Sequence, residues 1–353
     1  MIGEKQNQDV SGGSLAVQAK GDAFVHLGLS TSDLRAIVEC MADQLPKYAA
    51  IAAVIVEERL KTFEEKVVGK FDAELTQHRQ AFADPDFQYL LRSSQQTYAR
   101  SGDEQTCDNL VNLIAERSKI ASRDLISLSL NTAVERAGML SAEAFAALSY
   151  AFFWTKVRQS GKTTIGSVAK HLLQFADPIL AEVPRSDLSY SYLESVGCGK
   201  MQPLTSVTLP IILVQSYPHL FSNGVPKSDI EARVEDAAFA QSIIDAGILV
   251  HVGENLFVSS LGSQDEFITA IKGCGLADEK AKLAWEVVVS RPMANEQIDQ
   301  LLQSAGFKIS PHQEIWDSTA LRHFDLTTVG LAIGHANLKR VASFPADLSL
   351  WLN

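Results

Sequence analysis

Residues 14–29 form the pattern that most constrains the fold, because they predict a β-hairpin in front of a chain that otherwise has mostly helical patterns. Apolar and polar residues alternate on both sides of a Gly-Asp turn. An isolated two-stranded hairpin is marginal in water and leaves two unpaired edges, so it needs a partner strand. That partner is either a C-terminal strand at 347–352 or the same hairpin in another subunit. The residues predicted to carry this assembly are Leu15, Val17, Gln18, Gly21, Asp22, Phe24, Val25 and Leu27.

Composition limits the class of protein. The chain has 353 residues, 46% of them hydrophobic and 21% charged, which is ordinary for a globular protein, and its net charge is −11. This acidic balance argues against a surface that binds nucleic acid broadly. The four cysteines are far apart and form no C-x-x-C pair, which favours a reduced compartment. The N-terminus has no apolar signal segment and no apolar run approaches 20 residues, so we expect a cytoplasmic protein without constitutive membrane association.

A second pattern predicts a long helix over residues 47–82, after Pro46. This stretch contains no proline, and apolar residues recur along it at spacings of three and four. A helix of this length exceeds the usual core helix, so it either packs along a bundle or pairs with a neighbouring chain. The stripe that would carry self-association consists of Val56, Leu60, Phe63, Val67, Phe71 and Leu75.

Further helical patterns follow, and together they predict a helical bundle over residues 30–183. Asp84-Pro85 is a typical helix start and Ser101-Gly102 a typical helix end. More helices are expected at about 103–119, 122–137, 141–159 and 163–181. The polar, proline-containing break at 183–186 predicts a domain boundary. The expected domains are an N-terminal hairpin element (1–29), the bundle (30–183) and an α+β domain (184–353).

The last domain has the outline of a winged helix, because a helix at 236–246 is followed at once by a hairpin at 248–258. We therefore expect a mostly α fold with small β elements, ending in a winged-helix-like α+β domain. Neither that helix nor the hairpin contains lysine or arginine, the residues that supply most phosphate contacts. Protein contact is the favoured use, and nucleic-acid binding is the alternative.

No motif predicts a catalytic, cofactor-binding or metal-binding residue. The stretch Ser160-Gly161-Lys162-Thr163 lacks the upstream glycine and strand of a P-loop. Asp84-Pro85-Asp86 has the first half of a metal-dependent nuclease pattern, but the second half has the wrong spacing. A helix N-cap followed by proline accounts for these residues. The eight histidines show no metal-ligand spacing.

Several local motifs together resemble a known family. They are Ser14…Gln18-Ala19-x-Gly21-Asp22, Gly28-Leu29-Ser30, Asp84-Pro85-Asp86-Phe87-Gln88-Tyr89, Tyr98-Ala99-Arg100-Ser101-Gly102-Asp103, Gly197-Cys198-Gly199, Leu326-Thr327-x-x-Gly330-x-Ala332-Ile333-Gly334-x-Ala336-Asn337 and Leu348-Ser349-x-Trp351. In this order they resemble an uncharacterised family of bacterial cytosolic proteins known only by locus-tag names. That resemblance implies no activity. The Leu-Thr-x-x-Gly helix is also similar to the closing segment of some abortive-infection modules, which implies a role in stress or phage defence.

These observations predict a non-enzymatic, homo-oligomeric scaffold or sensor protein that could also bind a further protein partner, with no cofactor. Three alternatives stay open at this point. They are a nucleic-acid-binding winged-helix regulator, an enzyme whose site is built from distant residues, and an effector that exposes the apolar runs at 48–56 or 145–154 to a membrane after a trigger.

Overall fold

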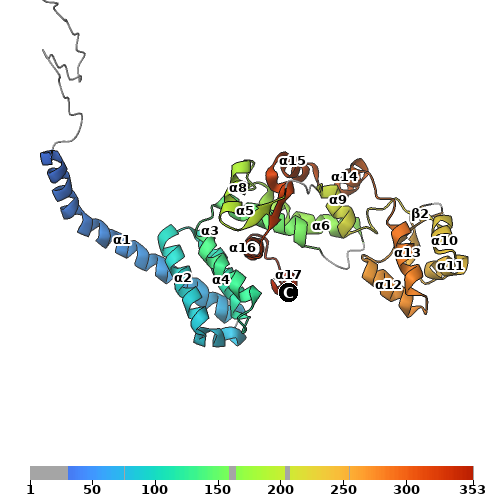
Figure 1. Cartoon of the computed structure of the whole chain (residues 1–353), viewed down its shortest axis with the longest axis horizontal. Helices are drawn as coiled ribbons and strands as arrows, with labels where there is room; N and C mark the ends of the chain where they lie inside the picture. The colour runs from blue at the N-terminus through green and yellow to red at the C-terminus, as the bar shows by residue number, and fades with distance from the viewer. Residues whose placement is uncertain (1–30, 75, 159–163, 203–206, 254, 353) are drawn as a thin grey trace, which may run out of the picture. The chain divides into compact units, whose positions relative to one another are not determined.

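The computed structural model describes residues 31–74, 76–158, 164–202, 207–253 and 255–352. The chain divides into two compact units, Met1–Glu57 and Glu58–Asn353. The described residues are mostly helical with two small antiparallel sheets (Figure 1), which confirms the predicted mostly α fold with small β elements. The predicted hairpin and its eight candidate assembly residues lie outside the described residues.

Helix α1 (Thr31–Glu74) begins directly after Ser30 and contains Pro46 within it. The expected α-helix over 47–82 is wrong at its end, because α1 stops at Glu74 and the 3-10 helix η1 (Thr76–Ala83) follows. The tighter turn brings the Phe82 ring against Phe71 and Phe87, with ring centroids 4.8 and 5.3 Å apart. A continuing α-helix would carry Phe82 away from these rings, so aromatic packing accounts for the early end.

The first helix after η1 begins and ends at the capping residues expected from the sequence. The Asp84 side chain accepts the backbone N–H of Asp86 and Pro85 opens the helix, which confirms the N-cap interpretation, while Gly102 ends it at φ 64°. The prediction of a single helix at 163–181 is wrong, because this segment forms two helices. It divides at Ala176, because Pro178 has no N–H to donate to the preceding turn. The helices are α2 (Pro85–Ser101), α3 (Glu104–Ser118), α4 (Leu125–Ala137), α5 (Ala142–Lys156), α6 (Ile165–Phe175) and α7 (Asp177–Leu180).

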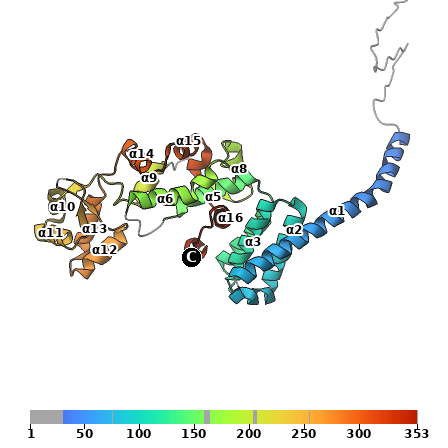
Figure 2. The same cartoon turned by 180° about the vertical axis from the view of Figure 1, so that it is seen from behind.

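The second half contains more helices and all of the described strands. In chain order they are α8 (Asp187–Ser195), β1 (Gly199–Met201), α9 (Leu209–Ser216), β2 (Val225–Pro226), α10 (Lys227–Val234), α11 (Ala237–Asp245), β3 (Leu249–His251), β4 (Leu256–Ser259), α12 (Gln264–Gly273), α13 (Asp278–Val288), α14 (Asn295–Ser304), α15 (Ser310–Ser318), the 3-10 helix η2 (Ala320–His323), β5 (Phe324–Leu326), α16 (Thr328–Ala342) and α17 (Ser349–Leu352). One sheet pairs β1 with β5, and the other has the order β2-β4-β3. Helices α10 to α13 pack with the second sheet around a small core of their own (Figure 2).

The main hydrophobic core does not follow the expected boundary at residues 183 and 184. Helix α16 packs against α5, α3 and α4, so the C-terminal part of the chain contributes the central helix of the bundle (Figure 1). Gly330 and Gly334 permit this packing, because they bring α16 against the backbone of Cys198 and Leu148. The core therefore joins residues from both sides of the expected boundary.

A buried carboxylate fixes α16 to α3 and to the C-terminal segment. The Glu116 side chain is 3% exposed. Its carboxylate accepts hydrogen bonds from Nζ of Lys339 at 2.5 Å and from Nζ of Lys119 at 3.0 Å. Lys119 also donates to Asp347 at 2.7 Å. Burial alone would raise the pKa of Glu116, but the charge and hydrogen bond of Lys339, together with the charge of Lys119, outweigh burial and hold the pKa below its usual value. The carboxylate is therefore charged and its charge is compensated.

Replacing Glu116 with leucine is expected to lower the free energy of unfolding by about 3–5 kcal/mol, the usual cost of breaking a buried ion pair. Lys339 and Lys119 would keep their charges but lose the carboxylate between them. Urea unfolding at pH 7 measures the loss. The double variant Glu116→Leu/Lys339→Met, which removes both charges, should recover part of it. A single variant within about 0.5 kcal/mol of the parent would contradict this account of the cluster.

The C-terminus differs from the expected strand at 347–352. Residues Ser349–Leu352 form the short helix α17, and Trp351 donates its indole N–H to the Lys156 carbonyl at 2.8 Å. The Trp351 ring also packs on Phe152, with centroids 5.0 Å apart. A strand would point alternate side chains to opposite faces, whereas the helical turn packs Trp351 and Leu352 into the core. The prediction of a strand at 347–352 is therefore wrong.

Candidate functional site

The part of α1 before residue 58 has an exposed apolar surface. Residues 48–56 are all apolar and all exposed, and the large side chains among them range from 37% exposed at Val56 to 62% at Tyr48. Leu45, which lies one turn earlier, is 61% exposed. Spacings of three and four residues place Leu45, Tyr48, Ile51 and Ile55 on one side of the helix, which we call the α1 apolar face.

The predicted α1 stripe has two different environments. Phe63, Val67 and Phe71 are buried in the core, where Phe63 and Phe71 pack against aromatic rings of the α2 region. Leu60 is half-buried and Val56 is exposed, while Leu75 lies outside the described residues. The buried part of the stripe is therefore used within the chain, and the exposed apolar surface lies at Val56 and the residues before it.

A groove lies between the second half of α1 and α2. It encloses about 620 Å³, with Phe63, Val67 and Phe82 among its lining residues. Val68 and Tyr89, which also line it, are 57% and 65% exposed. The charged side chains in this groove are Glu64 and Arg92. The groove is apolar enough to hold a helix and has one charge of each sign.

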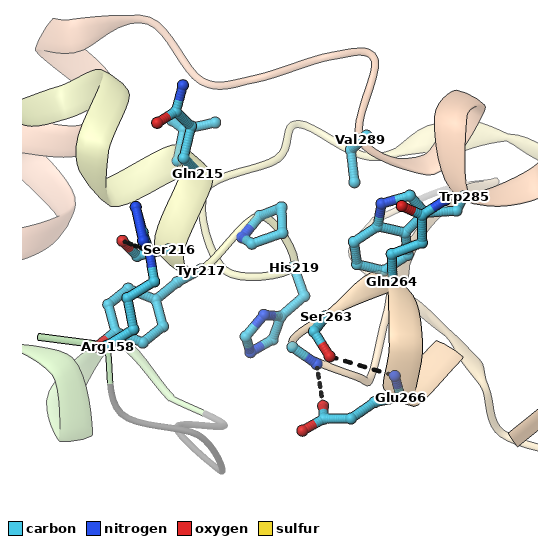
Figure 3. Close-up of a pocket in the computed structure, with 13 residues that line it drawn as sticks. Arg158, Gln215, Ser216, Tyr217, His219, Ser263, Gln264, Glu266, Trp285 and Val289 are labelled. Carbon is cyan, nitrogen blue, oxygen red and sulfur yellow. Dashed lines mark hydrogen bonds between the residues drawn. The ribbon is translucent and has the colours of Figure 1, made fainter. Parts of the chain in front are cut away.

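A separate pocket of about 610 Å³ lies between the end of α9 and the start of α12 (Figure 3). Its walls include the rings of Tyr217 and Trp285 and the side chain of Val289, and it is also lined by the basic, imidazole and acidic side chains of Arg158, His219 and Glu266. The size and the apolar lining are typical of a small-molecule site. Its ability to bind a ligand depends on whether these polar groups are available.

Two of these polar groups have structural partners inside the pocket wall. Glu266 accepts the backbone N–H of Gly262 at 3.0 Å, and the Ser263 hydroxyl accepts the backbone N–H of Glu266 at 3.2 Å (Figure 3). This is a capping arrangement at the start of α12, and the Ser-x-x-Glu spacing was present in the sequence. Arg158 donates from Nε to the Ser216 hydroxyl at 3.1 Å. The pocket therefore has the size of a ligand site, but Glu266 and Arg158 already form hydrogen bonds that stabilise the local fold.

The two carboxylates of the Asp84-Pro85-Asp86 motif contact Arg117. Arg117 is 2% exposed and donates from Nη2 to Asp86 at 2.9 Å and to Asp84 at 3.3 Å. Hydrogen bonds from Asn131 and Arg117 hold the pKa of Asp86 below its usual value. A guanidinium occupies the place that a cation would take in a nuclease site. Within the described ranges, no group of three or more His, Cys, Asp or Glu residues could hold a metal ion.

Two buried histidines lie in aromatic surroundings that the sequence patterns did not indicate. The Nδ1 atom of His312 lies 2.9 Å from the Tyr150 hydroxyl oxygen. The Nε2 atom of the same ring lies 3.5 Å from Oδ1 of Asp177. His335 bonds through Nε2 to the Ala346 carbonyl at 2.9 Å. Burial lowers the pKa of each to about 4, and in each case a nearby carboxylate opposes the shift without cancelling it. Both rings are therefore neutral near pH 7 and serve as packed hydrogen-bonding groups.

A protein-family model matches residues 28–352, which is nearly the whole chain. The chain belongs to this family. The family is described only by the suffix "-like", so its description names no reaction, ligand or partner. The expected membership in an uncharacterised family is confirmed. No curated protein and no solved structure shows significant similarity to the chain.

Among the described residues, no helix is both long enough and apolar enough to cross a bilayer.

Proposed function

We propose that this protein is a self-assembling scaffold whose copies associate through the α1 apolar face. The observation that carries the proposal is the run at 48–56, in which nine consecutive apolar residues are exposed on one helix. Large contiguous apolar patches are rare on monomeric proteins and mark interaction surfaces. Helices of this kind also gain most of their stability from packing an apolar face, which this part of α1 does not do within the described chain. Self-association supplies that packing.

Charges placed on the α1 apolar face are expected to break the assembly. In the variant Ile51→Glu/Ile55→Glu, association would bury two carboxylates in an apolar contact, so we expect the apparent dissociation constant to rise at least 100-fold. Sedimentation equilibrium measures this change. The matched control Ala50→Glu/Ala53→Glu adds the same charge to the opposite side of the helix and should have a much smaller effect. Equal effects of the two pairs would contradict the assignment to this face.

We also propose that residues 225–259 form a winged helix that contacts protein rather than nucleic acid. The order β2-α10-α11-β3-β4 and the sheet order β2-β4-β3 support the winged-helix assignment. Five of the six basic residues between 227 and 291 are paired with carboxylates. Phosphate contacts would have to compete with these ion pairs, which favours a protein partner. The role in stress or phage defence stays a prediction from the C-terminal likeness.

A further inference from the structure

We infer that the α1 apolar face of one copy docks in the groove between α1 and α2 of a second copy. This inference rests on the self-association proposed above and names its acceptor surface. Both surfaces belong to the same chain, so each copy carries one donor face and one acceptor groove. When the docking is reciprocal, it closes a dimer with two equivalent contacts.

The groove has the shape and lining that a helix requires. Its volume of about 620 Å³ is bordered along α1 by residues 63–68 and along α2 by residues 88–95. Phe63 and Val67 are buried, whereas Val68 and Tyr89 remain more than half exposed. Apolar grooves between helices commonly bind an amphipathic helix through anchor residues on one face. The exposed Val68 and Tyr89 would be covered by such a helix.

The α1 apolar face has the spacing of anchors in a helix-in-groove contact. Tyr48, Ile51 and Ile55 stand at positions i, i+3 and i+7, and Leu45 precedes them by one turn. All four are at least 42% exposed. Ala52 lies among the anchors on the same side of the helix, so the backbone can approach a neighbour closely there.

The stripe along α1 also supports a helical partner. Val56, Leu60, Phe63 and Val67 follow one another at spacings of three and four, and the buried part of this stripe packs in the core beside α2. The exposed part continues the same apolar pattern without a covering helix among the described residues.

Charges at the two surfaces are complementary and orient the contact. The groove contains Glu64 and Arg92, and neither forms an ion pair with a described residue. The α1 apolar face is flanked by Lys47 at its start and by Glu57 and Glu58 at its end. One orientation places Lys47 near Glu64 and the two glutamates near Arg92. Rim charges of this kind select register and orientation.

A charge-reversal experiment tests the inference on the full-length chain. Arg92→Glu should weaken association at least 10-fold by placing a negative charge opposite Glu57 and Glu58. Adding Glu57→Lys/Glu58→Lys to this variant should restore most of the loss. Lys170→Glu makes the same charge reversal on the exposed surface of α6 and should leave association unchanged. Sedimentation equilibrium gives the dissociation constant of each variant.

The outcomes separate this inference from the proposed function. A wild-type chain that stays monomeric overturns both. A wild-type dimer whose affinity is unaffected by Arg92→Glu overturns the groove assignment and leaves self-association standing. A benzophenone photocrosslinker replacing Tyr48 gives an independent measurement, with isotope-labelled and unlabelled copies mixed. We expect crosslinks between copies to peptides 63–68 or 88–95, whereas crosslinks to residues 45–56 of the other copy would show direct pairing of two α1 faces instead.

Discussion

Replacing Gly330 with alanine is expected to lower the free energy of unfolding by about 3 kcal/mol, the upper end of the usual cost of overpacking a core. A Cβ atom at this position would overlap the backbone carbonyl of Cys198. Neither side can yield easily, because the Thr327 N–H donates to that same carbonyl at 3.2 Å and its hydroxyl donates to the Gly197 carbonyl at 2.7 Å. Helix α16 would have to move away from the segment that contains Gly197 and Cys198. This movement would disturb the packing of α16 in the centre of the bundle. Thermal and urea unfolding measure the loss.

Gly273→Ala provides a matched control for this substitution. Gly273 is the last residue of α12, and a Cβ atom there would meet nothing within 4 Å. Alanine costs less backbone entropy on folding than glycine, so this variant should be as stable as the parent or up to about 1 kcal/mol more stable. Similar stability of the Gly330 and Gly273 variants would contradict the close packing described for α16.

Lowering the pH from 6.5 to 4 is expected to destabilise the protein strongly. Burial lowers the pKa of His312 and His335 from 6.5 to about 4 in the folded state. Within this window the unfolded chain binds two protons that the folded chain does not bind, so stability falls as the pH falls. Each shift corresponds to roughly 3 kcal/mol, and the full loss is reached below pH 4. The stability contributed by the neutral rings is present above pH 6.5.

Variants at these two histidines test the sign and the size of the effect. His335→Gln keeps an N–H donor for the Ala346 carbonyl but cannot titrate. The slope of the unfolding free energy against pH should therefore decrease by the amount that corresponds to about one bound proton. The double variant with His312→Gln should lose most of the dependence between pH 6.5 and 4. Urea unfolding at intervals of about half a pH unit gives the slopes. Profiles parallel to that of the parent would show that other groups cause the acid sensitivity.

Local signals in the sequence were sufficient to place many of the helices. Capping residues such as Asp84 and Gly102 satisfy backbone groups at helix ends, and their effect depends only on neighbouring residues. The same holds for Thr327, whose hydroxyl accepts the backbone N–H of Gly330 at the start of α16. These predictions succeeded because short-range hydrogen bonding decides where such helices begin and end.

Features that depend on distant contacts were not predictable in the same way. The helix α17 forms where a strand was expected, because Trp351 packs against Phe152 from another part of the chain. The buried pairing of Glu116 with Lys339 joins residues more than two hundred positions apart. The exposed state of residues 48–56 could not be separated from core burial by sequence alone, since an apolar helical stripe has the same pattern in both cases.

The most direct test of self-association is the mass of the native full-length protein in solution. Light scattering coupled to size exclusion, over a range of loading concentrations, gives this mass without a ligand or label. The α1 apolar face predicts at least twice the 38.4 kDa of one chain, with dissociation on dilution. A mass of 38.4 kDa at every concentration, with the Ile51→Glu/Ile55→Glu variant indistinguishable from the parent, would contradict the account.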